Sequence, residues 1–240
     1  MQTGLIDQAR AWLAAAHSVA VLTGAGISAE SGVPTFRGDG GLWRDYKPED
    51  LATPEAFARD PKLVWEWYDW RRQQIKDAKP NPAHLALVEL EKRKRGFTLI
   101  TQNVDGLHDL AGSGKILKLH GDIWRMKCLE CGANFPNRRV PLPKIPPHCA
   151  CGGVARPGVV WFGEPLPDGI MKEAEHACEA DVFLTIGTSA VVFPAAGLIT
   201  YAKERGAKVI EINPQETQFS PVVDCALRGK AGELLPQLIS

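Results

Sequence analysis

The sequence predicts an α/β fold in which a doubly wound, parallel, Rossmann-like sheet carries a small second domain. Four short runs of apolar residues each end in glycine or polar residues, as expected for strands buried on both faces of a parallel sheet. Helical stretches separate several of these runs, and such alternation is typical of doubly wound sheets. The four runs occupy residues 19–22, 97–100, 182–186 and 208–212.

The predicted helices follow from apolar spacing along the chain. From Leu5 to Ala16, apolar residues recur at helical spacing ahead of the first strand. Two further helices are expected, near residues 81–95 and 195–205. Because ligands bind beyond the carboxyl ends of the strands in such folds, the residues that follow each strand are the first candidates for a site.

Composition and charge exclude several classes of protein. The 240 residues include 28 Lys and Arg and 28 Asp and Glu, so no basic excess exists to neutralise phosphates, and we expect no specific binding of nucleic acid. No apolar stretch approaches the roughly 20 residues of a membrane span, so no membrane association is expected. The first residues lack the pattern of a secretory signal peptide, which predicts a cytoplasmic location. The oligomeric state is left open, and a monomer is compatible with the sequence.

A glycine-rich loop follows the first predicted strand. Residues 24–29, GAGISA, fit the pattern G-x-G-x-x-A, in which glycines allow a tight turn and close approach to a pyrophosphate at a helix N-terminus. The string alone is also compatible with a bare turn. A dehydrogenase would next carry a second strand ending in an acid, but residues 34–43 form no strand pattern. We therefore expect a nucleotide bound in a non-standard way, under a loop, with Asn213 as a candidate ribose contact.

Four of the six cysteines are spaced as metal ligands. In a reducing cytoplasm a disulfide framework is not expected, and two close pairs separated by 17 residues resemble a zinc ribbon. Four thiolates close a tetrahedral shell, so one structural Zn²⁺ is predicted. His148 is an alternative ligand beside the second pair, whereas Cys178 and Cys225 are expected to be small buried hydrophobes. The predicted ligands are Cys128, Cys131, Cys149 and Cys151.

Two stretches interrupt the alternation of strands and helices, and they define the expected domains. Residues 1–34, 79–123 and 158–240 are expected to form the Rossmann-like nucleotide-binding domain. Residues 35–78 are expected to form a helical insertion and cofactor loop, and residues 124–157 a zinc-binding module.

Several motifs together resemble the sirtuins, the family of NAD-dependent protein deacylases. The signature at residues 24–37, GAGISAESGVPTFR, is similar to that of the family. Further matching motifs follow in the family's order across nearly the whole chain: TQNVDGLH at 101–108, LHGD at 119–122, the four cysteines, VVWFGE at 159–164, GTS at 187–189 and GKAGE at 229–233.

This resemblance implies roles for specific residues. As an isolated residue, His120 has a structural explanation as well as a catalytic one, and Asn103 is compatible with a strand-end cap. The resemblance implies the catalytic residues His120, Asn103 and Asp105. It implies NAD contacts from Gly24, Ala25, Gly26, Ser28, Ala29, Thr35, Phe36, Arg37, Trp43, Gln102, Asn103, Val104, Asp105, Gly187, Thr188, Ser189, Asn213, Pro214, Gln215 and Ala231. It implies substrate contacts from Tyr68, Arg71, Val160, Phe162, Gly163 and Glu164.

The resemblance also implies a reaction on acylated lysine side chains of proteins or peptides. In the family the acyl oxygen attacks the nicotinamide ribose and expels nicotinamide. His120 would then activate a ribose hydroxyl, since a histidine titrates near working pH. The products are free lysine, nicotinamide and O-acyl-ADP-ribose. Glu164 and Gly163 would belong to a strand edge that pairs with the substrate peptide.

One positive charge is misplaced on the predicted helix around residues 64–75. At 100° per residue, Tyr68 and Arg71 fall within the apolar stripe of this helix. A buried guanidinium needs an anionic partner, which is either a carboxylate of the protein or one on the substrate. The spacing Y-x-x-R resembles that of the sirtuin subclass that removes succinyl, malonyl or glutaryl groups, so removal of both acetyl and acidic acyl groups is predicted.

Three other functions share parts of these patterns. A protein ADP-ribosyltransferase would cleave the same bond of NAD, and an NAD-dependent oxidoreductase would share the glycine loop. The oxidoreductase is disfavoured because its second-strand acid is absent. A nucleic-acid-binding cysteine ribbon would need clustered basic charge, and only a modest group is present: Lys127, Arg138, Arg139 and Lys144.

Overall fold

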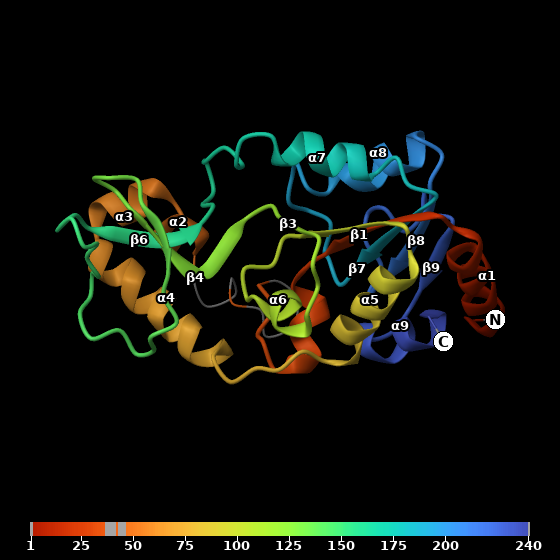
Figure 1. Ribbon diagram of the computed structural model, residues 1–240, viewed down its shortest axis with the longest axis horizontal. Helices are drawn as coiled ribbons and strands as arrows, with labels where there is room; N and C mark the ends of the chain where they lie inside the picture. The colour runs from red at the N-terminus through yellow and green to blue at the C-terminus, as the bar shows by residue number, and fades with distance from the viewer. Residues whose placement is uncertain (1, 37–41, 43–46, 240) are drawn as a thin grey trace.

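The computed structural model describes residues 2–36, 42 and 47–239. Its centre is a parallel sheet of six strands in the order β3-β2-β1-β7-β8-β9 (Figure 1). The order runs outward in both directions from β1, as a doubly wound sheet requires. The strands are β1 (Ser18–Thr23), β2 (Gly96–Thr101), β3 (Ile116–Lys118), β7 (Val182–Ile186), β8 (Lys208–Ile212) and β9 (Cys225–Leu227).

Helices cover both faces of this sheet. In β1, Val19 and Val21 pack on one face against α1, α5 and α9, while Ala20 and Leu22 pack on the other against α7 and α8 (Figure 1). Because both faces are buried, the strand is apolar at consecutive positions rather than at alternate ones. The helices are α1 (Gln2–Ala15), α5 (Pro82–Arg93), α7 (Ile170–Ala177), α8 (Gly197–Glu204) and α9 (Ala231–Ile239), with a short α6 (Leu107–Ala111) after β2.

The four predicted strands are confirmed, and so are the predicted helices near residues 5–16, 64–75, 81–95 and 195–205. The sequence did not indicate β3 and β9 as strands, because each is only three residues long and forms an edge of the sheet. The glycine loop leads into a 3₁₀ helix, η1 (Ala25–Ser31), where the dinucleotide pattern is typically followed by an α-helix. Gly32 ends it with φ of 79°, a conformation that favours glycine. No described residue between this helix and β2 forms a strand, as expected.

A second unit lies at the end of the molecule opposite α1 and α9 (Figure 1). It contains α2 (Pro48–Leu51), α3 (Pro54–Arg59) and α4 (Pro61–Ile75), and a three-stranded antiparallel sheet in the order β5-β4-β6. The strands are β4 (Gly121–Cys128), β5 (Asn134–Pro136) and β6 (Ala155–Val159).

The second unit has a hydrophobic core of its own. Trp65 and Val64 of α4 pack there with Met126 of β4 and Ala155 of β6, so the two insertions share one core. Such sharing explains how two segments that are each too short to bury a core can fold. We propose the same domain boundaries as the sequence analysis. Strands β4 and β6 extend across the borders at residues 124 and 157 and so join the two domains.

None of the described helices combines the length and apolar character that crossing a membrane would require. Cys178 and Cys225 are buried free thiols, one against the α7 and α8 side of the sheet and the other against the α1 and α9 side. Both agree with the expectation of small buried hydrophobes.

Candidate functional site

A cavity of about 1210 Å³ lies between the carboxyl ends of β1, β2, β7 and β8 and the second unit. This is the position that a doubly wound sheet predicts for a ligand. Most of the predicted site residues line it: Gly24, Ala25, Gly26, Ala29, Thr35, Phe36, Tyr68, Arg71, Gln102, Asn103, Val104, His120, Val160, Phe162, Gly163, Glu164, Gly187, Thr188, Ser189, Asn213, Pro214, Gln215 and Ala231. Ser28 and Asp105 do not line it, and Arg37 and Trp43 lie outside the described residues.

The floor of the cavity is built from two loops in direct backbone contact. The amide of Gly26 donates to the carbonyl of Gly187 over 2.7 Å. A Cβ on Gly24 would lie 2.7 Å from Cα of Thr188, and one on Gly26 would lie 2.7 Å from the Gly187 oxygen. Only glycine permits this approach, and the resulting small, backbone-lined floor fits a nucleotide diphosphate.

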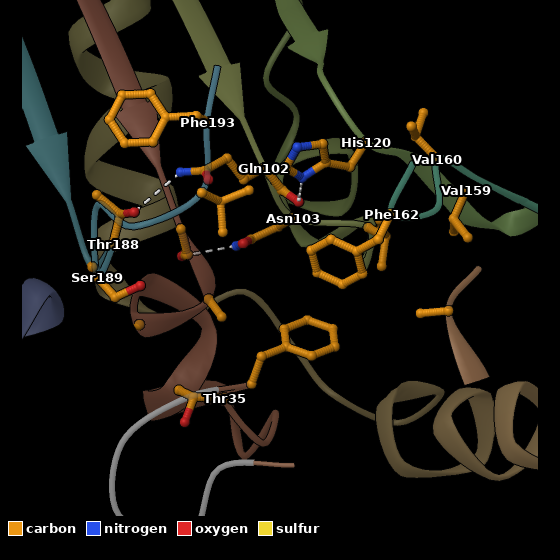
Figure 2. Close-up of a pocket in the computed structure, with 18 of the residues that line it drawn as sticks. Thr35, Gln102, Asn103, His120, Val159, Val160, Phe162, Thr188, Ser189 and Phe193 are labelled. Atoms are coloured by element: carbon orange, nitrogen blue, oxygen red, sulfur yellow. Dashed lines mark hydrogen bonds between the residues drawn. The ribbon is translucent and has the colours of Figure 1, made fainter. Parts of the chain in front are cut away.

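Further polar contacts join the loop after β7 to its neighbours. Gln102 donates from Nε2 to Oγ1 of Thr188 over 3.1 Å (Figure 2). Asn213 donates from Nδ2 to the Thr188 carbonyl over 3.0 Å. Thr188 therefore links the ends of β2, β7 and β8. Asn213 lines the cavity as expected, and its amide group orders the loop.

His120 lies at the start of β4 with its ring facing the cavity (Figure 2). Its Nδ1 lies 3.1 Å from the carbonyl oxygen of Gln102. Since a carbonyl only accepts, Nδ1 carries the proton, and Nε2 is left with a lone pair. Burial lowers the pKa of His120 and outweighs the opposing effect of the Gln102 carbonyl. The ring is therefore neutral at pH 7 and able to accept a proton, as a general base must.

Behind the cavity wall, Asn103, Ser28 and Asp105 form a buried chain of hydrogen bonds. Nδ2 of Asn103 donates to the Gly24 carbonyl over 3.0 Å, and Oγ of Ser28 donates to Oδ2 of Asp105 over 2.8 Å. The amide of Leu107 donates to Oδ1 of Asp105 over 2.9 Å. Burial raises the pKa of Asp105, opposed by these hydrogen bonds. Asp105 thus supports the loop from behind and does not reach the cavity in this structure.

On the opposite wall, helix α4 presents Tyr68 and Arg71 to the cavity. Arg71 is 2% exposed, and its Nη1 lies 3.4 Å from the carbonyl of Pro34. Its guanidinium stacks over the rings of Phe36 and Trp67, with centroid distances of 4.8 and 5.9 Å. No carboxylate of the described residues lies within ion-pair distance of this guanidinium, and burial lowers the pKa of Arg71 to about 10. A buried cation facing a cavity in this way is suited to an anionic ligand.

Tyr68 is oriented by a hydrogen bond that leaves its proton available. Its hydroxyl oxygen accepts from Nε1 of Trp161 over 2.9 Å. Since the indole only donates, the tyrosine proton can be given to another acceptor. Burial raises the pKa of Tyr68, so the phenol stays neutral. Tyr68 and Arg71 together offer donors on one face of α4.

The segment after β6 carries the other predicted substrate residues. Glu164 accepts a bidentate ion pair from Arg156 and a hydrogen bond from the amide of Trp161 over 2.8 Å. Arg156 in turn stacks over the Trp161 ring at 3.5 Å. The carboxylate of Glu164 is therefore occupied within the protein. Gly163, with φ of 85°, turns the chain between Phe162 and Glu164.

The four predicted zinc ligands converge at one end of the second unit. Their sulfurs all lie within 4.8 Å of one another, with Cys128 to Cys151 at 3.5 Å and Cys131 to Cys149 at 3.8 Å. A tetrahedron of Zn–S bonds of about 2.3 Å places sulfurs about 3.8 Å apart, so the cluster fits one structural Zn²⁺. His148 is not part of the cluster, and its Nδ1 lies 3.1 Å from the Pro146 carbonyl.

Comparison with known proteins decides the family. The sequence profile of the Sir2 family matches residues 24–194. A protein of Aquifex aeolicus (strain VF5), named NAD-dependent protein deacylase, is 57% identical over 216 residues, which cover 89% of this chain and 90% of the relative. The chain belongs to the Sir2 family. The resemblance to sirtuins inferred from the sequence motifs is thereby confirmed.

Solved structures of Sir2 homologues are similar to this chain in fold, in agreement with its membership of the family. One, described as a complex with NAD, has a TM-score of 0.91 and 48% identity, and the match covers 97% of this chain and 92% of that one. Another, a mutant in complex with ADP-ribose, has a TM-score of 0.94 and 48% identity, covering 97% and 94%.

One organising residue of the sirtuin site was missed from the sequence. Glu211 is buried in β8, and its carboxylate accepts from Thr217, from Ser220 over 2.5 Å and from Arg228 over 2.7 Å. These bonds hold the segment 213–217, which lines the cavity. The available signal was an acid inside an otherwise apolar strand, since a buried charge without a role is expensive.

A pair of buried histidines lies below the glycine loop. Nε2 of His108 lies 3.0 Å from Oγ1 of Thr23, and Nδ1 of His84 accepts from the amide of Asn81 over 3.3 Å. Their ring centroids are 4.8 Å apart. Burial lowers the pKa of His84 to about 4 and that of His108 to about 3, the latter helped by the nearby His84. Both rings are neutral in the folded protein at pH 7.

We predict that this histidine pair makes stability fall between pH 6.5 and pH 5. The unfolded chain takes up protons below about pH 6.5 while the folded rings stay neutral, which costs roughly 1.4 kcal/mol per pH unit for each histidine. The measurement is urea unfolding at several pH values. His84→Gln should flatten the pH dependence, whereas His176→Gln, at an exposed position, should not change it. An unchanged slope in His84→Gln would contradict the prediction.

We predict that Gly26→Ala separates the two floor loops. The new methyl group would meet the Gly187 carbonyl oxygen, so the free energy of unfolding should fall by about 1–3 kcal/mol. Affinity for NAD should fall as well, which calorimetric titration would measure. Gly4→Ala is the matched control, because nothing lies within 4 Å of a Cβ at that position. Equal NAD affinity in the two variants would refute the close-contact argument.

We predict one zinc ion per chain, required for the fold of the cysteine region. Four thiolates in tetrahedral contact leave no open coordination position, so the metal stabilises structure and performs no chemistry. Metal analysis of Cys131→Ser should find less than one zinc per chain. Thermal unfolding of the same variant should give a lower melting temperature. Cys178→Ala should retain one zinc. Full zinc content in Cys131→Ser would overturn the assignment.

Proposed function

We propose that this sirtuin is an NAD-dependent protein-lysine deacylase that removes acetyl groups and also acidic acyl groups such as succinyl and malonyl. The NAD-dependent deacylase activity is the one for which its relatives are named. The acidic-acyl activity rests on one observation. The buried guanidinium of Arg71 faces the cavity that contains His120 and has no carboxylate of the described residues within ion-pair distance.

In this proposal the floor loops hold NAD. Gly24, Gly26 and Gly187 provide the close backbone surface for the pyrophosphate, and Thr188 and Asn213 hold the loops at the ends of β7 and β8. The cofactor supplies a ribose that receives the acyl group when nicotinamide is released. Backbone donors in such a loop bind phosphate oxygens without a cationic side chain.

His120 is proposed to be the general base. Its Nδ1 proton is held by the Gln102 carbonyl, so the unprotonated Nε2 faces the cavity and can take a proton from a hydroxyl. Burial lowers the pKa of His120, which keeps the base unprotonated at neutral pH. Asn103 is proposed to position the reacting groups near Nε2, with Ser28 and Asp105 fixing its loop from behind.

Arg71 and Tyr68 are proposed to bind the carboxylate of an acidic acyl group. A guanidinium presents two parallel N–H donors to a carboxylate, and the tyrosine adds one O–H donor. Binding such an anion would also neutralise the buried charge, which among the described residues lies against the Pro34 carbonyl and two aromatic rings, with Asp105 acting on it from beyond ion-pair distance. An acetyl group needs none of these donors, so deacetylation does not depend on them.

The substrate peptide is proposed to lie along residues 160–164. Phe162 is 42% exposed beside the cavity, and Val160 lies next to His120 (Figure 2). The turn at Gly163 exposes this segment, to which an extended peptide can add by main-chain hydrogen bonds. The ion pair between Arg156 and Glu164 holds the segment in place.

The deciding experiment offers NAD with three matched peptides that carry acetyl-lysine, succinyl-lysine or unmodified lysine. Peptide mass and released nicotinamide are followed together. We expect loss of both acyl groups, with one nicotinamide per lysine freed, and no change of the unmodified peptide. ADP-ribose attached to protein without any acyl substrate would favour an ADP-ribosyltransferase. Reduction of NAD to NADH would favour an oxidoreductase, and an unchanged pair of acyl peptides would defeat the proposal.

Arg71→Met separates the two acyl activities. Loss of a charged hydrogen-bond donor costs about 1.5–3 kcal/mol, so kcat/KM for desuccinylation should fall by roughly 10- to 100-fold. Deacetylation should change far less, because the acetyl group has no carboxylate. Tyr68→Phe should show a smaller loss in the same direction. Equal loss of both activities in Arg71→Met would contradict the carboxylate assignment.

A further inference from the structure

Helix α4 has two buried faces, one toward residues 124–157 and one toward the cavity. At 100° per residue, Trp65, Asp69 and Arg72 fall within a stripe about 60° wide. Tyr68 and Arg71 lie on the neighbouring stripe, which faces the cavity. All five side chains are buried, so α4 is held on both sides. The first stripe faces residues 124–157, which we name the cysteine module.

At the N-terminal end of this stripe, Trp65 bonds to strand β6 of the cysteine module. Nε1 of Trp65 donates to the carbonyl of Ala155 over 2.7 Å. Ala155 in β6 pairs directly with Cys128 in β4. The position of α4 is therefore tied to a residue opposite one of the four ligands.

The middle of the stripe bonds to the proline-rich loop of the module. Oδ1 of Asp69 accepts from the amide of Leu142 over 3.1 Å. Its other oxygen accepts from Nε2 of Gln73 over 3.2 Å. Asp69 is 4% exposed, and it joins the loop to the helix through one buried carboxylate.

At the C-terminal end of the stripe, the side chain of Arg72 is fully buried. Nη2 of Arg72 donates to the main-chain oxygen of Asn137 and to its Oδ1, the latter over 2.8 Å, and the guanidinium stacks over Trp124 at 5.3 Å. Its Nε and Nη1 find no partner among the described residues, and no carboxylate of those residues forms an ion pair with it.

These contacts are costly if their only role is stability. A buried unpaired charge is expensive, and apolar residues of similar volume often replace such groups without loss of stability. Directional hydrogen bonds do what apolar packing alone does not: they prevent the helix from sliding or rotating on its neighbour. The four hydrogen bonds made by these three side chains therefore restrict the rotation of α4 on the cysteine module, and with it the direction of Tyr68 and Arg71.

We propose that Trp65, Asp69 and Arg72 are positioning residues through which the cysteine module sets the acyl preference of the cavity. This inference rests on the proposed acidic-acyl activity. An acidic acyl group needs the donors of Tyr68 and Arg71 at fixed distances from His120, whereas an acetyl group does not. Loosening α4 on the module therefore weakens desuccinylation before it affects deacetylation.

Four variants test this proposal. We name the hydrogen bonds of Trp65, Asp69 and Arg72 to the cysteine module the latch. Asp69→Ala removes the carboxylate that accepts from Leu142, and Asn137→Ala removes the Oδ1 that accepts from Arg72. Trp65→Phe removes the indole N–H while keeping an aromatic ring. Asp69→Asn retains an acceptor oxygen for the Leu142 amide and should restore most of the wild-type behaviour. The control on the same helix is Glu66→Ala, because Glu66 is exposed and its one ion pair among the described residues is with Lys62.

The readout is the ratio of kcat/KM for succinyl-lysine to that for acetyl-lysine peptide. Zinc content, NAD affinity and melting temperature are measured on the same samples. Because small misplacements of a binding group cost up to about 100-fold, we expect the ratio to fall by roughly 5- to 30-fold in Asp69→Ala and Asn137→Ala. The KM for the succinyl peptide should rise, with zinc content and NAD affinity unchanged. Glu66→Ala should keep the wild-type ratio.

The outcomes distinguish this inference from the proposed function. If Arg71→Met changes the ratio but the latch variants lower both activities equally, the latch is only structural and the inference is wrong. If Arg71→Met itself leaves desuccinylation intact, the proposed carboxylate site is wrong. If Asp69→Ala does not fold, Trp65→Phe decides the same question, and an unchanged ratio in that folded variant refutes the inference.

Discussion

The contact between the loops after β1 and β7 is the constraint on which the rest of the site depends. Gly26 and Gly187 meet through a 2.7 Å hydrogen bond at a distance that no side chain allows. Because β1 and β7 are neighbours in the sheet, this contact closes the floor of the cavity where the two halves of the doubly wound sheet meet.

The six-stranded sheet and the second unit flank the cavity, and each is held by hydrophobic clusters of its own. The sheet provides loops whose backbone suits a dinucleotide, and the second unit provides the aromatic and cationic wall. In the proposed function, NAD lies against the sheet and the acylated peptide lies against the second unit. His120 stands at the junction, at the start of β4, whose other end carries the ligand Cys128.

Buried polar groups in this protein are used for orientation more than for stability. The Gln102 carbonyl selects the tautomer of His120, Trp161 directs the hydroxyl of Tyr68, and Asp105 holds Ser28 from behind. Each of these hydrogen bonds restricts the orientation of a side chain in or behind the cavity wall. Arg71 differs, because no carboxylate of the described residues lies within ion-pair distance of its guanidinium, and Asp105 acts on it only at longer range.

The sequence alone determined the parallel sheet, the floor loop and the four zinc ligands, because each depends on local patterns: unbroken apolar runs, glycine spacing and cysteine spacing. It also placed Arg71 on an apolar helix face. Only the tertiary structure decided that Asp105 lies behind the cavity, that Glu164 is paired with Arg156, and that α4 is bonded to the cysteine module. These facts depend on residues far apart in the chain meeting in space, and no local spacing records which partner a buried polar side chain will find.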